Sequence, residues 1–102
     1  MQVTITSRHD DVPEALRARA EAVMGRLAKL THRPTRGQVE FGLQHQRATA
    51  VLRIHAAQSA VFVASADAPD HRTALDRAAA KLRRQVDKRP TSVRRAGGGK
   101  GP

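Results

Sequence analysis

Two helix-period stripes, separated by strand-like segments, limit the folds open to this chain of 102 residues. In the first stripe, apolar residues recur at intervals of four and three positions, as on the buried face of a helix. In the second, within residues 70–89, a helical turn of about 100° per residue brings five apolar side chains within roughly 60° of one direction. The stripes consist of Leu16, Ala20, Val23, Leu27 and Leu30, and of Leu75, Ala78, Ala79, Leu82 and Val86.

Four other segments have the alternation or the apolar content of β-strands. In the second of them, Val39, Phe41 and Leu43 share one face. The fourth is apolar almost throughout, which is typical of a strand well inside a sheet. Short polar connections between the last three segments predict consecutive hairpins. The strands are expected at residues 2–6, 38–46, 49–57 and 60–68.

The expected element order is therefore β-α-β-β-β-α. Because each helix has one apolar stripe, we expect an α+β fold, a two-layer sandwich in which a four-stranded sheet carries two helices on one face. Asp10 or Asp11 is expected to cap the first helix and Asp70 the second. Residues 1–89 are predicted to form one domain, and residues 90–102 a flexible basic tail.

The composition argues against several classes of site. The chain has no cysteine, hence no disulfide and no thiolate metal site. None of its five histidines lies three or four positions from another, and no carboxylate cluster accompanies them, so no metal site is predicted. No nucleophile or phosphate-loop motif is complete, and we expect no enzyme, cofactor or small-molecule substrate. No apolar run reaches the 18 residues of a membrane span, which predicts a soluble cytoplasmic protein.

The positive charge is concentrated near the end of the chain. The formal net charge is +10, with nine basic and six acidic residues in positions 1–69 and ten basic and three acidic in positions 70–102. On the second helix, four cations lie well away from the apolar stripe, and its acids fall on one flank. Such a row indicates a polyanionic partner, and the small apolar face disfavours a membrane surface. We call this row the basic strip: Arg77, Lys81, Arg84 and Lys88.

The kind of nucleic-acid contact can also be narrowed. Phe41 and Phe62 are the only aromatic residues, and both are expected in the core, so stacking on bases is disfavoured. Contacts from the helices to phosphates remain. If the two helices lie side by side, the first helix extends the basic strip through Arg19, Arg26 and Lys29.

The chain resembles the short ribosome hibernation promoting factor / ribosome-associated inhibitor (sigma-54 modulation protein) family. The resemblance lies in residues 1–8 (MQVTITSR), in 14–17 (EALR) and 26–30 (RLAKL) at the start and end of the first helix, and most strongly in 64–66 (ASA), Asp70, 74–76 (ALD) and 81–86 (KLRRQV). It implies a protein that binds the small ribosomal subunit and its rRNA near the decoding region and inhibits translation in stationary phase or stress. Carried over by position, the resemblance implies rRNA contacts at Arg8, Arg26, Lys29, Lys81, Arg84 and Lys88.

Two departures from the family pattern leave the mode of action open. Arg72 stands where the family usually has a tyrosine, and residues 89–102 contain four basic residues and no acid. Two modes of action therefore remain open, promotion of ribosome dimers and inactivation of single ribosomes. The free chain is expected to be a monomer. A double-stranded RNA-binding module is an alternative, against which the extra first strand argues. A small histidine-dependent enzyme is the other alternative.

Overall fold

A computed structural model describes residues 1–8 and 11–88, with the backbone alone for Lys88. The elements follow the predicted order, and a short 3-10 turn, Ala57–Ser59, joins the last two strands. The expected tail and Asp10 lie outside the described residues. The bounds are β1 Gln2–Ser7, α1 Glu14–Leu30, β2 Pro34–Gln44, β3 Arg47–Ala56, β4 Val61–Ala68 and α2 His71–Lys88.

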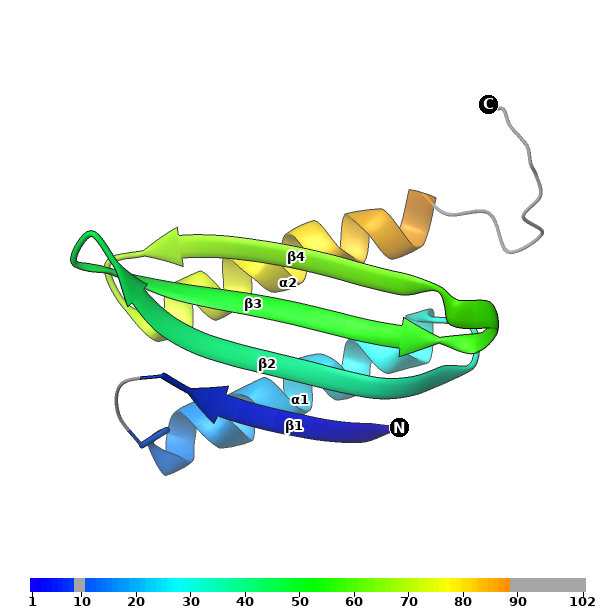
Figure 1. Cartoon of the computed structure of the whole chain (residues 1–102), viewed down its shortest axis with the longest axis horizontal. Helices are drawn as coiled ribbons and strands as arrows, with labels where there is room; N and C mark the ends of the chain where they lie inside the picture. The colour runs from blue at the N-terminus through cyan, green and yellow to red at the C-terminus, as the bar shows by residue number, and fades with distance from the viewer. Residues whose placement is uncertain (9–10, 89–102) are drawn as a thin grey trace.

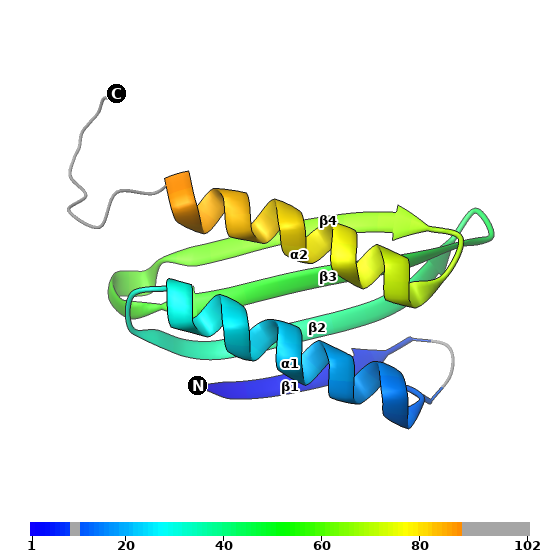
Figure 2. The same ribbon diagram turned by 180° about the vertical axis from the view of Figure 1, so that it is seen from behind.

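The four strands form one sheet in the order β1-β2-β3-β4. β1 pairs in parallel with β2, whereas β2, β3 and β4 pair antiparallel. A parallel neighbour requires a crossover, which α1 supplies. Both helices cover the same face of the sheet and lie next to each other, as Figures 1 and 2 show from the two sides. The predicted two-layer α+β sandwich is confirmed, and we call the uncovered side of the sheet the open face.

The core lies between the helices and the covered face of the sheet. Phe41 and Phe62 belong to it, as predicted, and the two helices contribute mostly alanines and leucines. Small side chains allow the helices to pack close to the strands. The largest fully buried side chains are Phe41, Met24, Leu52, Ile54, Leu75, Leu82 and Val39.

The first helix stripe was wrong at its last position. Leu30, the last residue of α1, is 45% exposed, and Met24 is instead fully buried. Leu43 is 50% exposed because the β2–β3 hairpin extends beyond the start of α2, where no helix covers it (Figure 2). An apolar pattern marks the face of an element but not how far its neighbour reaches.

β2 begins earlier than expected, at Pro34. Proline is tolerated at the first position of a strand because its missing N–H costs little there. Gly37 follows within the strand, where an added Cβ would lie 2.8 Å from Met24 Cε and 3.0 Å from Met1 Cε. The glycine therefore permits close approach of α1.

β4 is an edge strand, so the prediction of an inner strand was wrong. Its alternate residues are buried, but Val61 and Val63 face the open side and are 43% and 40% exposed. Alanines on the covered face and valines on the open face together produced the continuous apolar run.

The helix N-termini differ in their capping. Pro13 occupies the N-cap position of α1 without a side-chain cap, so Asp11 does not cap this helix. At α2 the cap is confirmed, because the backbone N–H of Thr73 donates to Asp70 Oδ2 at 2.9 Å. This bond, together with the donation from the Thr73 hydroxyl, lowers the pKa of Asp70.

Candidate nucleic-acid interface

Two members of the basic strip, Arg77 and Lys81, lie on the flank of α2 that overhangs β4. Three α2 side chains at four-residue intervals reach the outer edge of β4 and donate hydrogen bonds to its backbone carbonyls. The bonds run from Arg77 Nη1 to the Asp67 carbonyl (3.1 Å), from Lys81 Nζ to that of Ser65 (3.0 Å) and from Gln85 Nε2 to that of Val63 (2.6 Å).

We call Arg77, Lys81 and Gln85 the edge cap. Their acceptors belong to alternate residues of an edge strand, which would otherwise offer a row of free carbonyls to another chain. Their four-residue spacing on one helix flank can be read from the sequence, but the capping role was not predicted from it. Carbonyls are neutral, so the two cations of the edge cap keep their net charge. They can still attract an anion.

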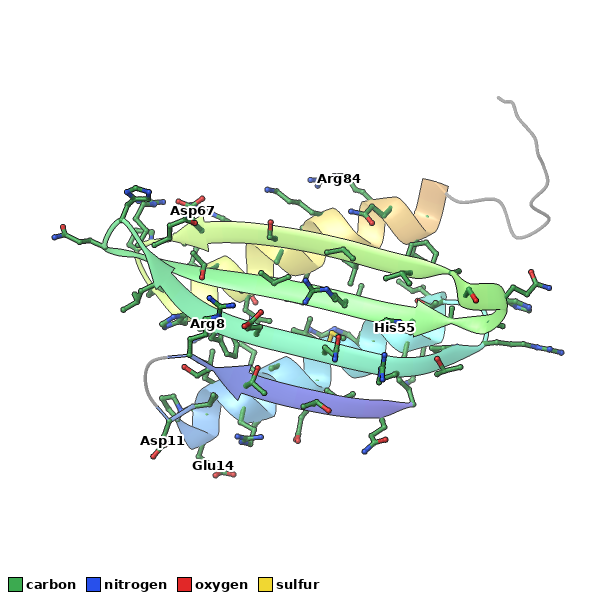
Figure 3. All side chains as sticks on the ribbon, in the orientation of Figure 1. Arg8, Asp11, Glu14, His55, Asp67 and Arg84 are labelled. Atoms are coloured by element: carbon green, nitrogen blue, oxygen red, sulfur yellow. The ribbon has the colours of Figure 1, made fainter. Side chains whose placement is uncertain are left out.

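Arg84 is the freest cation of the basic strip. It is exposed, and within residues 1–8 and 11–88 no hydrogen bond or ion pair holds it. Figure 3 shows it projecting beyond the edge of β4. For Lys88, the fourth member, the side chain lies outside the described residues.

Arg19 has a structural partner. Its Nε donates to Asp76 Oδ1 at 3.0 Å and its Nη2 to Oδ2 at 2.8 Å, a two-pronged bond between α1 and α2. The hydrogen bond with Asp76, followed by the charge of that carboxylate, raises the pKa of Arg19. Because this geometry uses both carboxylate oxygens, the guanidinium is engaged in holding the helices together.

Arg26 and Lys29 are exposed on α1 and have no polar partner in the described part of the chain. The helices lie side by side, as the expected extension of the strip required. However, Asp76 on one flank of α2 contacts α1, whereas the edge cap on the other flank contacts β4. α2 therefore lies between α1, which carries Arg26 and Lys29, and the β4 edge that Arg77 and Lys81 contact.

The structure instead brings Arg8 and Lys81 to one depression on the open face. Arg8, 73% exposed, forms an ion pair with Glu40 at 2.9 Å. Arg47, which the sequence analysis missed, pairs with Asp67, and this bond lowers the pKa of Asp67. The depression lies at the β2–β3 hairpin end of the sheet, and Figure 3 shows Arg8 and Asp67 near that end. Its lining includes Arg8, Glu40, Arg47, Ser65, Asp67 and Lys81.

Other kinds of site have little support in this structure. Over the described ranges, no group of three or more potential ligands could hold a metal ion. His71 donates from Nε2 to the Gly42 carbonyl at 2.9 Å and meets the ring of Phe41 edge-on. Those contacts fix the start of α2 against β2. No helix in the described residues is long and apolar enough to cross a membrane.

Two solved structures from bacteria have a fold similar to that of this chain. A ribosomal subunit interface protein from Coxiella burnetii is 19% identical, with a TM-score of 0.75 over 86% of this chain and 96% of that one. The Protein Y N-terminal domain of Thermus thermophilus is 21% identical, with a TM-score of 0.74 over 86% of this chain and 98% of that domain. No curated protein sequence matches the chain. Residues 3–94 match a family-wide pattern, and the chain belongs to the family described as Sigma 54 modulation protein / S30EA ribosomal protein.

Proposed function

We propose that this protein is a ribosome hibernation factor. It binds the small ribosomal subunit near the decoding region, contacts rRNA phosphates and inhibits translation in stationary phase or stress. The family match supports association with the ribosome, and two proteins of the same fold are a ribosomal subunit interface protein and the N-terminal domain of Protein Y. In this proposal the protein is cytoplasmic, works without catalysis or a cofactor, and is a monomer when free.

One observation carries the rRNA part of the proposal. Three members of the basic strip, Arg77, Lys81 and Arg84, lie near an edge of the sheet, and among the described residues no carboxylate pairs with them. Cations left without acidic partners suit a backbone of phosphates, which binds through charge and releases counterions. The aromatic side chains are buried, so base stacking contributes nothing from them. The proposed contacts are Arg8, Arg26, Lys29, Arg77, Lys81, Arg84 and Lys88, and Arg19 acts as a positioning residue.

The structure also bears on the double-stranded RNA-binding alternative. Such a module has the order α-β-β-β-α, whereas β1 is here a full strand, paired with β2 over six residues. Residues 1–89 are proposed as the ribosome-binding domain and residues 90–102 as a basic tail.

Co-sedimentation with purified small subunits tests the proposal. We expect the wild-type chain to bind, and Arg84→Gln and Lys81→Gln each to reduce the salt slope of the affinity by about one. The matched control is Arg17→Gln, which removes an exposed α1 cation outside the proposed contact set. A wild-type chain that stays unbound, or binds equally at all salt concentrations, would refute the proposal.

The physiological part needs a separate measurement. We expect the chain to travel with ribosomes in a sucrose gradient of a stationary-phase lysate, and to inhibit translation in a purified system. Its distribution between single and paired ribosomes then decides which mode of inactivation it uses. Absence of the chain from all ribosomal fractions counts against a hibernation role.

A further inference from the structure

A second group of basic residues lies on the open face, on β2 and β3. The register pairs Arg36 of β2 directly with His55 of β3, and Arg53 precedes His55 by two residues on the same face. Arg36 Nη2 lies 3.5 Å from His55 Nε2. Figure 3 shows His55 on the side of the sheet that the helices leave open. We call Arg36, Arg53 and His55 the sheet cluster.

No acid compensates the sheet cluster in the described parts of the chain. Arg53 has Gln38 and Val63 as its cross-strand neighbours, and His55 has Val61 on its other side. The cross-strand neighbour of Arg36 on β1 is Gln2. The nearest carboxylate along β2, that of Glu40, is already paired with Arg8. The guanidinium groups of Arg36 and Arg53, on adjacent strands without a counter-charge, disfavour each other, which indicates an anionic ligand that compensates them.

The sheet cluster continues toward the basic strip. Arg53 is paired in register with Val63, and the next open-face residue of β4, Ser65, has its carbonyl capped by Lys81. Neighbouring strands lie about 4.8 Å apart, so the cations form a row that crosses the sheet from β2 to the edge of β4. Beside this row the exposed side chains of Val61 and Val63 offer apolar contact.

We propose that the sheet cluster is a second phosphate-binding surface, which holds the backbone of an RNA strand crossing the open face from Lys81 to Arg36. A row of separate cations matches a chain of evenly spaced phosphates, and the valines between them match ribose and base edges. This inference rests on the proposed rRNA binding and extends it to the face opposite the helices. It takes the phosphodiester backbone as its ligand and needs no base stacking.

The test compares two double variants that remove the same charge. Arg36→Gln/Arg53→Gln alters the sheet cluster, and Arg17→Gln/Arg83→Gln alters exposed helix cations outside it. With a short uridine oligonucleotide, the first variant should reduce the salt slope of binding by roughly 1.4, about 0.7 for each lost contact with a single strand. The control should leave the slope unchanged, and Arg36→Lys/Arg53→Lys should retain most of it.

Nuclear magnetic resonance locates the contact without any substitution. On titration with the oligonucleotide, we expect the signals of residues 53–55 and 61–63 to shift. Shifts confined to α2, or equal binding by both double variants, overturn the inference. The inference is also overturned if polyglutamate displaces the bound oligonucleotide as effectively as a free oligonucleotide of the same length does. That result would favour an acidic protein partner.

Small-subunit co-sedimentation separates the two proposals. If the wild-type chain fails to sediment with small subunits, the proposed function fails. The other outcome is that the wild-type chain sediments while the two double variants, Arg36→Gln/Arg53→Gln and Arg17→Gln/Arg83→Gln, bind small subunits equally well. In that case the second surface alone fails.

Discussion

Arg19 and Arg84 are both arginines on the helical layer, yet their surroundings differ. Arg19 grips the Asp76 carboxylate with two nitrogens, whereas Arg84 projects into solvent with no partner among the residues that the structure describes. A guanidinium that already has a carboxylate gains less from a phosphate than a free one does, because it must exchange one anion for another. We therefore assign Arg19 to helix packing and Arg84 to binding.

This difference predicts separate effects of two equal changes. Arg19→Gln should lower the melting temperature, since Asp76 loses its partner, and should leave the salt slope of ribosome binding unchanged. Arg84→Gln should reduce the salt slope of ribosome binding and leave the melting temperature unchanged. Circular dichroism on heating measures the melting temperature, and co-sedimentation at several salt concentrations measures the salt slope. Introducing Asp76→Asn into the wild-type chain and into Arg19→Gln isolates the contribution of the Arg19–Asp76 pair. A slope loss for Arg19→Gln as large as that for Arg84→Gln would place Arg19 at the RNA.

At the scale of elements, α2 has two functions on opposite flanks. One flank binds α1 through Asp76, and the other covers the edge of β4 through the edge cap. Long charged side chains are a common means of keeping an edge strand from pairing with another chain. The same cations are thus proposed to protect the sheet in the free protein and to bind phosphate in the complex.

Removal of the edge cap should make the protein prone to aggregation. In Arg77→Ala/Lys81→Ala/Gln85→Ala, the carbonyls of β4 lose their donors and become acceptors for a second chain. We expect increased light scattering on heating, which the single change Arg84→Ala should not produce. If the triple variant remains as soluble as the wild-type chain, the edge cap has no protective role.

The whole molecule is a slab 18 Å thick along its shortest axis, with proposed RNA contacts on more than one side. With a formal net charge of +10, binding through phosphates should depend strongly on salt. For about six contacts, we expect the affinity for small subunits to fall by roughly 10³ between about 50 and 200 mM salt. Titrations at several salt concentrations measure this fall, and a nearly flat dependence would contradict a phosphate-based mechanism.

Local patterns in the sequence were sufficient for the element order, the helix faces and the cap at Asp70. Periodicity and capping involve residues a few positions apart, so they can be read before the fold is known. The place of β4 could not be found in this way. Its apolar run is compatible with an inner strand, and only the pairing of the sheet shows that one side of β4 has no strand beside it.

The amino-acid sequence by itself determined the two-layer architecture, the excess of positive charge and the resemblance to a ribosome-associated family. The tertiary structure alone decided which cations are free and where they gather. Arg19 and Asp76 are 57 residues apart, and Arg36 and His55 are 19 residues apart. Contacts over such distances depend on helix packing and strand register, which no short-range pattern encodes. The basic strip was visible in the sequence, but its direction toward β4 and the open face follows from the fold.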